Sequence, residues 1–467
     1  MLRVMSPSSA DAAGSAVHPD GLPVPRRYWS MAAIALAITM SVLDSTIVNV
    51  ALPTIARDFH ASSATSIWVV SAYQLAILVV LLPLSSLGEI VGYRRVSQTG
   101  LVVFTLASLG CAFAPTLLTL SIMRAIQGLG AAGIMSVSGA LVRFTYPHRH
   151  LGRAVGINAF VVASSAALGP TIAAGVLSIA HWRWLFGINV PLGVITLLIA
   201  LYALPENERT VRPLNFAGAA LYAGTFGLLL SGLQSFAHNE ATAIAFLQIA
   251  AGGLLGWRLV RHELPRAAPL IPFDLLRIRL FRLSLASSIC SFMAQMSALV
   301  SLPFEIQRLG HSAVETGLLM TPWPLALALV APAAGRLSDR YPAGILGGLG
   351  LLLLATGLVL LALLPVPATV TGFAWRMALC GAGFALFQAP NNRTIMATAP
   401  RARSGAAGGM LSAARLTGQT LGAVMVAVLF RAYDTAAPGV TLWIAAGLAV
   451  AGAVVSTTRL TATPARS

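Results

Sequence analysis

Long apolar stretches alternate with short polar segments over almost the whole chain. Fourteen of these stretches approach the length of about 20 residues that a helix needs to cross a bilayer. They cover residues 29–53, 66–87, 97–115, 117–141, 154–178, 184–204, 214–236, 241–260, 283–304, 315–335, 344–364, 369–391, 404–430 and 437–457. Because the hydrocarbon core offers backbone groups no hydrogen-bond partner, each stretch is expected to be a helix. The pattern predicts an all-α integral membrane protein with 14 transmembrane helices.

The composition agrees with this pattern. Of the 467 residues, 57% are hydrophobic and only 9% are charged, and the mean hydropathy is +0.82. Soluble domains carry about 25% charged residues, so the composition excludes a soluble enzyme. The net charge of +16 comes from 30 basic residues, all of them arginine. Sparse charges on an apolar chain do not form a basic groove, so we expect no nucleic-acid partner.

The arginines indicate how the chain is oriented. If the N-terminus is cytoplasmic, most arginines lie on the cytoplasmic side, and those predicted outside are Arg57, Arg183, Arg308 and Arg431. By the positive-inside rule, both termini are then cytoplasmic, with tails at 1–28 and 458–467. The first apolar run is too long for a cleavable signal peptide. We expect a multi-pass protein of the bacterial plasma (inner) membrane, since the lack of lysine suits a GC-rich bacterial genome.

Two pairs of short motifs indicate an internal repeat. Residues 85–89 end the second stretch as 335–340 end the tenth, and Gly-Leu-Gly at 128–130 matches Gly-Ala-Gly at 381–383. A shift of eight helices predicts two six-helix halves, at 29–204 and 283–457, separated by a two-helix insert and cytoplasmic linker at 205–282. Such repeats are typical of secondary transporters, with the substrate site between the halves. Chance similarity of short apolar motifs is the alternative.

Four segments resemble the motifs of a known transporter family. They are Leu43–Pro53 in the first span, Arg124–Ala132 in the fourth, Gly169-Pro170 with Gly175 in the fifth, and Trp182–Pro191 entering the sixth. In this order they resemble the major facilitator superfamily and, within it, the fourteen-helix drug:proton antiporter family. The match extends from about Arg27 to Leu460.

This resemblance implies the major facilitator fold and a secondary transporter that exports hydrophobic, drug-like compounds by alternating access, in exchange for protons. The expected partners are small hydrophobic or cationic substrates, protons and the lipid bilayer. The proton gradient would be the energy source, without a cofactor. We expect a monomer that is not an enzyme.

Asp44 is the only acidic residue well inside a predicted span. A charge inside a membrane is costly and therefore marks a candidate functional site. Burial disfavours the charged carboxylate and a nearby arginine favours it, so movement of the helices could switch its protonation. Arg124 lies at a comparable depth in the fourth span. We predict that the two residues couple transport to protons, and that Asp44 binds a proton, a cationic substrate or both in turn; a static ion pair is the alternative.

Six residues are candidates for a substrate cavity. Arg415 lies near the middle of a span without acidic residues, so it either binds an anionic or polar substrate group or is satisfied by carbonyls and amides. Trp323 and Tyr73 could line a cavity for planar compounds, or they could only pack. The whole set is Arg415, Gln127, Gln419, Asn391, Tyr73 and Trp323.

Two further groups of residues have roles that the resemblance implies. The ends of the second and tenth spans would form a cytoplasmic gate whose carboxylates bridge to a neighbouring helix; capping and topology are the alternative. That gate consists of Glu89, Gly92, Arg94, Arg95, Asp339 and Arg340. The motif at Gly169, Pro170 and Gly175 would bend the fifth span and allow close helix packing.

Other chemistries find little support. Without lysine there can be no phosphate-binding loop of the Gly-x-x-x-x-Gly-Lys-Ser/Thr type, so no nucleotide is expected. The histidines lie outside the predicted spans and the three cysteines lie within them, so neither a metal site nor a disulfide is expected. The alternative function is proton-coupled transport of a small anion or metabolite. A non-transporting receptor or a membrane enzyme is a remote alternative of another class.

Overall fold

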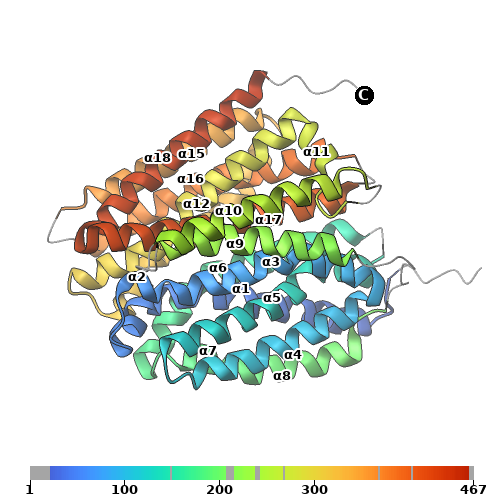
Figure 1. The fold of residues 1–467 in the computed structure, drawn as a ribbon, viewed down its shortest axis with the longest axis horizontal. Coiled ribbons are helices and arrows are strands. Elements are labelled where there is room, and N and C mark those ends of the chain that lie inside the picture. The colour runs from blue at the N-terminus through green and yellow to red at the C-terminus, as the bar shows by residue number, and fades with distance from the viewer. Residues whose placement is uncertain are drawn as a thin grey trace, which may run out of the picture.

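The computed structural model describes residues 21–147, 150–206, 215–236, 242–266, 269–365, 369–400 and 403–461. These parts of the chain form helices and connecting turns, without a β-strand. Figure 1 shows the helices running side by side as one bundle. Most of the predicted tails, 1–28 and 458–467, lies outside the described residues.

Each predicted apolar stretch corresponds to a helix or to a helix with one break. The long helices are α1 (Arg26–Asp58), α3 (Trp68–Val91), α4 (Tyr93–Ala112), α5 (Leu117–Thr145), α6 (Leu151–Ile179), α8 (Asn189–Ala203), α9 (Phe216–Ser235), α10 (Thr242–Glu263), α12 (Arg279–Arg308), α14 (Pro322–Leu337), α15 (Ala343–Ala362), α16 (Val370–Thr398), α17 (Ser404–Tyr433) and α18 (Ala437–Thr457). The short helices are α2 (Ser63–Ser66), α7 (Trp184–Gly187), α11 (Phe273–Arg277) and α13 (Ala313–Met320), with 3-10 turns η3 (Asp434–Ala436) and η4 (Thr458–Thr461). The break between α13 and α14 falls just before Pro322, which has no N–H for the helical ladder.

Twelve helical segments of the described chain are long and apolar enough to cross a membrane. One of them, Ala406–Thr461, covers most of α17 and all of α18. Helix α4 is not among the twelve, because Arg94 and Arg95 in its first turn lower its mean hydropathy. The predicted number of 14 spans is therefore not confirmed by apolar length, although each predicted stretch corresponds, over its described residues, to a helix or to a helix with one break.

The two halves repeat one packing pattern. In the first half α5 packs against α3 and α4, and α1 packs against α6 and α8. In the second half α16 packs against α14 and α15, and α12 packs against α17 and α18. These are equivalent helices after the shift of eight, so the repeat inferred from short motifs is present in three dimensions.

A glycine occupies the same place in both halves and brings two helices together. A Cβ on Gly128 of α5 would lie 2.5 Å from the carbonyl oxygen of Tyr73 on α3. A Cβ on Gly381 of α16 would overlap the carbonyl oxygen of Trp323 on α14. The matching glycines of the sequence repeat are thus explained by backbone contact, as expected for close helix pairs in membranes.

Gly128→Ala is expected to destabilise the protein, because backbone atoms of α3 leave no room for the methyl group. Overpacking costs about 1–3 kcal/mol. Gly139 is a matched control on the same helix, since a Cβ there would meet nothing within 4 Å. Gly139→Ala should be neutral or stabilising by up to about 1 kcal/mol. Thermal unfolding of both purified variants in detergent tests this, and equal melting temperatures would contradict it.

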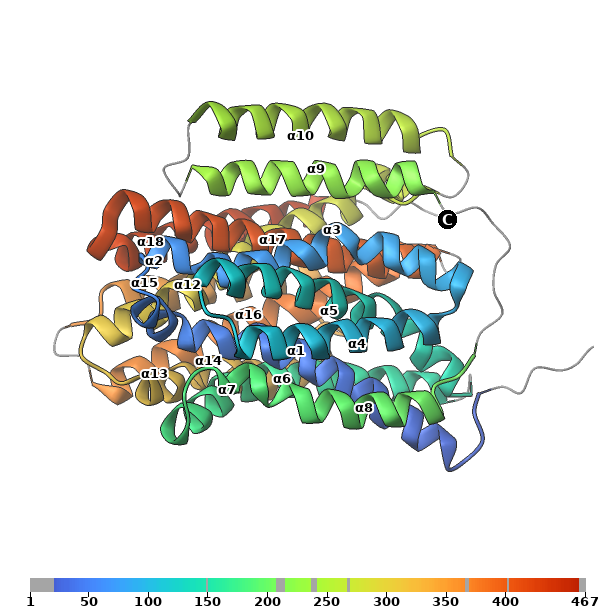
Figure 2. The same ribbon diagram turned by 60° about the horizontal axis from the view of Figure 1, so that its bottom comes forward.

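The predicted insert forms a separate helix pair. Figure 2 shows α9 and α10 lying together along one side of the bundle. Helix α9 contacts α3 of the first half and α17 of the second half. The pair therefore lies against the junction of the halves without interrupting the packing pattern of either one.

Candidate functional site

Asp44 and Arg124 form a buried ion pair inside the first half. Asp44 lies on α1 and Arg124 on α5, and the Arg124 guanidinium donates through Nη1 to Oδ2 of Asp44. The exposed fraction of the side chain is 0% for Asp44 and 1% for Arg124. The two candidates for proton coupling are therefore in direct contact, as the sequence predicted for neighbouring helices.

Neutral groups complete the surroundings of this pair. Gln127 Nε2 and Asn189 Nδ2 both donate to Oδ1 of Asp44, at 3.0 and 2.9 Å. The Arg124 guanidinium donates to Gln127 Oε1 at 2.7 Å and lies 4.1 Å from the centroid of the Tyr73 ring. The Tyr73 hydroxyl donates a hydrogen bond to the backbone carbonyl of Ser41 at 2.9 Å. The carboxylate is thus fully partnered and out of contact with solvent in this conformation.

Tyr73 and Gln127 were predicted as cavity residues, and the structure corrects both positions. They surround the ion pair, and neither lines the cavity described next. Asp44 does not line it either, so this conformation offers no direct contact between its carboxylate and a bound substrate. The reason is the helical turn of about 100° per residue, which points side chains on one helix toward different neighbours.

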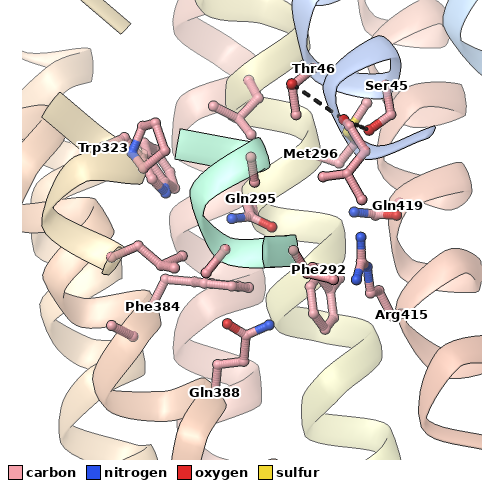
Figure 3. A pocket seen from close by; sticks show the side chains of 18 of the residues that line it. Ser45, Thr46, Phe292, Gln295, Met296, Trp323, Phe384, Gln388, Arg415 and Gln419 are labelled. Carbon is pink, nitrogen blue, oxygen red and sulfur yellow. Dashed lines mark hydrogen bonds between the residues drawn. The ribbon is translucent and has the colours of Figure 1, made fainter. Parts of the chain in front are cut away.

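A cavity of about 440 Å³ lies between the two halves. The first half contributes residues of α1, α3 and α6, and the second half contributes residues of α12, α13, α14, α16 and α17. Figure 3 shows Trp323, Phe292, Phe384 and Met296 around this space, with amide side chains between them. The size is within the range of about 300–1,000 Å³ that is typical of small-molecule sites.

Arg415 is the one charged residue that lines the cavity in the described chain. Its guanidinium lies 5.9 Å from the centroid of the Phe292 ring, and its Nε has no hydrogen-bond partner in the described structure. Gln419, one turn further along α17, lies next to it in Figure 3. Arg415, Gln419 and Trp323 are thus placed in the cavity, as the sequence predicted.

Asn391 was also predicted in the cavity, and that prediction was wrong. Its amide donates to Ser288 Oγ at 2.8 Å and accepts from the Arg459 guanidinium at 2.6 Å, within a buried cluster. Asn392, the next residue of α16, lines the cavity in its place. A shift of one residue along α16 turns the side chain by about 100°, so Asn391 and Asn392 face different surroundings.

The halves are joined at the end of the bundle that the arginines predict to be outside. Arg57 on α1 donates to Gln307 on α12, and the hydroxyls of Thr171 and Thr321 lie 2.9 Å apart. A Cβ on Gly317 of α13 would lie 2.6 Å from the carbonyl oxygen of Pro170 on α6. The cavity is therefore closed toward the outside by contacts between α1, α6, α12 and α13.

The predicted gate residues lie at the opposite end of the bundle. Asp339, after α14, accepts from the Arg393 guanidinium of α16 at 2.5 Å, which is the predicted bridge to a neighbouring helix. Arg94 donates to Glu206 at 3.0 Å. Gly92, with a φ of +106°, makes the turn from α3 to α4, and Glu89 lies in the last turn of α3. Their neighbours Arg95 and Arg340 are exposed.

The predicted bend motif is only partly explained. Helix α6 is continuous around Pro170. A Cβ on Gly169 would overlap the Thr46 side chain of α1, which agrees with close packing there. Gly175 does not contribute to close packing in this conformation, because a Cβ there would meet nothing within 4 Å.

Sequence reasoning missed several amide residues, among them Asn189, Asn49 and Gln74. Asn189 was part of a motif but had no role, and it donates directly to Asp44. Asn49 and Gln74 line the cavity, and each has an amide oxygen without a hydrogen-bond partner in the described structure. An amide inside an apolar span is itself a signal that could have identified all three. No group of His, Cys, Asp and Glu that could hold a metal ion was found among the described residues.

Comparisons with known proteins identify the family. The model of the Major Facilitator Superfamily matches residues 34–423, and again residues 285–466. The uncharacterized transporter YebQ of Escherichia coli (strain K12) is 52% identical over 448 residues, covering 95% of this chain and 98% of its own. The multidrug resistance protein Stp of Mycobacterium tuberculosis (strain CDC 1551 / Oshkosh) is 32% identical over 409 residues, covering 86% and 75%.

A solved structure agrees in fold. A bacterial homolog to the human lysosomal transporter Spinster, in an inward-facing and occupied conformation, superposes with a TM-score of 0.67 at 15% identity, covering 95% of this chain and 98% of that one. The chain therefore belongs to the major facilitator superfamily of multi-pass membrane transporters.

Proposed function

We propose that this transporter exports amphipathic small molecules from the cytoplasm of a bacterium in exchange for protons. Its place would be the inner membrane with both termini cytoplasmic, and the proton gradient would be its energy source. The similarity to the multidrug resistance protein Stp supports export of drug-like compounds. The mainly apolar cavity between the halves supports a small organic substrate.

One observation carries this proposal: the ion pair and the cavity share helix α1. Asp44 faces Arg124 inside the first half, whereas the next two residues, Ser45 and Thr46, line the cavity. A proton on Asp44 would remove one charge of the pair and weaken its hold on α5. Any resulting movement of α1 would also move part of the cavity wall.

Helix α1 also connects the ion pair to the opening and closing of the outer end that alternating access requires. Helix α1 also takes part in the outer closure through Arg57 and its bond to Gln307. Protonation of Asp44 from the outside would therefore act on a helix that both contacts the substrate and closes the outer end. Release of the proton toward the cytoplasm would restore the ion pair and the closed outer end.

The test is transport by the purified protein in proteoliposomes with an acidic lumen. Molecules inserted with the cytoplasmic face outward should accumulate a dye such as ethidium or 8-anilino-1-naphthalenesulfonate inside the vesicles. Nigericin, which collapses the pH gradient when K⁺ is present, should stop this accumulation. Uptake that ignores the gradient would contradict proton coupling. Uptake no greater than in empty vesicles, for both dyes, would contradict export of such compounds.

A second candidate function is proton-coupled transport of a small anion or metabolite. The cavity favours it through Arg415, since no carboxylate lines the cavity in the described chain. The same vesicles distinguish the two functions, because a carrier for small polar anions should ignore both dyes and transport an anion such as a dicarboxylate.

A further inference from the structure

Resting on the proposed function, we infer that the preferred substrate is an aromatic anion. Its acidic group would bind Arg415 and the neighbouring amides, and its aromatic body would lie against Trp323 and Phe384. The inferred substrate class differs from the one expected from the sequence, which included cationic compounds.

The charges around the cavity favour an anionic substrate. Arg415 lines it, and no carboxylate does so in the described part of the chain. Asp44, the deep acidic residue, faces away and is already paired with Arg124. A cationic substrate would therefore meet a positive charge without a nearby carboxylate, whereas an anion would meet a complementary one. At the low effective dielectric of such a site, both effects are large.

The Nε hydrogen-bond donor of Arg415 also favours a substrate with an acidic group. Its Nε has no partner in the described structure, and Phe292 offers only the face of an aromatic ring. A buried donor without a partner is costly, so the site gains most from a ligand that accepts hydrogen bonds. A guanidinium binds planar carboxylates, and other oxyanions, through two parallel bonds.

Neighbouring groups extend the same preference. Figure 3 shows the amides of Gln419, Gln295 and Gln388 facing the space beside Arg415. The indole Nε1 of Trp323, across the cavity, also lacks a hydrogen-bond partner in the described structure. Each of these groups can donate to an oxygen of the ligand, as expected for a site with few convergent polar groups in an apolar wall.

The experiment compares two probes that share one aromatic body. N-phenyl-1-naphthylamine is neutral, and 8-anilino-1-naphthalenesulfonate carries an additional sulfonate that stays ionised at every useful pH. Equilibrium dialysis with the purified protein in nanodiscs measures both affinities, with empty nanodiscs as background. Arg415→Gln should weaken sulfonate binding by about ten- to a hundredfold and leave the neutral probe within about threefold. Arg415→Lys keeps the charge and should recover part of the loss.

Arg376→Gln is the matched control. Arg376 is also an arginine within a helical span, but it donates to the backbone carbonyl of Gly372 on its own helix and does not line the cavity. This variant should bind both probes as the wild type does. Equal weakening of both probes by Arg415→Gln would overturn the inference, because it would indicate a structural role. Unchanged sulfonate binding in that variant would overturn it as well.

The result is distinguishable from failure of the proposed function. If ethidium uptake is driven by the proton gradient and Arg415→Gln does not affect sulfonate binding, only the inference on the substrate fails. If sulfonate binding depends on Arg415 and neither dye moves with the proton gradient, the inference stands as a binding site and proton-coupled export fails.

Discussion

Asp44→Asn is expected to abolish proton-driven dye accumulation in proteoliposomes while leaving exchange of dye down its own gradient intact. Asparagine has the shape of aspartate and cannot take up a proton at this position. The oxygen of an asparagine at this position can still accept from the amides of Gln127 and Asn189, so the hydrogen bonds now made to Oδ1 of Asp44 can be kept and the contact with Arg124 is lost. The cavity wall is unchanged, because Asp44 does not line it.

Asp58→Asn is a matched control on the same helix. Asp58 lies at the outer end of α1 and accepts from the Trp182 indole at 3.0 Å, which an asparagine oxygen can also do. This variant should keep gradient-driven uptake. Full gradient-driven uptake by Asp44→Asn would contradict the proposed role of Asp44. Loss of downhill exchange in Asp44→Asn would indicate a defect of structure, which comparing the variants by size exclusion and thermal unfolding would reveal.

The fold was predictable because a membrane restricts it so strongly. Apolar length defines the helices, and the glycines at 128 and 381, which indicated the repeat, both lie close to the backbone of a neighbouring helix, at Tyr73 and Trp323. The breaks before α3, α8 and α14 were not predicted, since a short interruption hardly changes the apolar pattern of a span.

The sequence predicts how deep each candidate residue lies in the membrane, but it does not predict which neighbouring helix its side chain faces. Asp44 and Arg124 were expected to meet because their depths agree, and their opposite charges need each other in an apolar interior. Tyr73, Gln127 and Asn391 have suitable depth as well, yet they face other helices. The side of a helix that faces the cavity depends on which helices are its neighbours, and apolar length carries no information on that.

Arg124→Gln is expected to reduce both stability and coupling, and its combination with Asp44→Asn should restore only stability. The single variant buries the Asp44 carboxylate without a cation, and breaking a buried pair from one side costs about 3–5 kcal/mol. Without Arg124, Asp44 can no longer alternate between an ion pair and a neutral acid, which is the step that the proposed mechanism couples to transport. Dye would still exchange down its own gradient, but it would no longer accumulate against it.

In the double variant neither charge is buried, whereas each single variant leaves one charge buried without its partner. The double variant should therefore unfold at a higher temperature than either single variant, while proton-driven accumulation stays absent. Thermal unfolding of the wild type, both single variants and the double variant in detergent gives the coupling free energy between the two sites. Additive losses of stability would contradict a direct interaction between Asp44 and Arg124. Proton-driven accumulation in the double variant would show that the proton is carried elsewhere, even if the ion pair stabilises the first half. The contact between Asp44 and Arg124 is thus expected to serve both stability and proton coupling. Recovery of stability without recovery of proton-driven accumulation in the double variant would identify the pair as the coupling element.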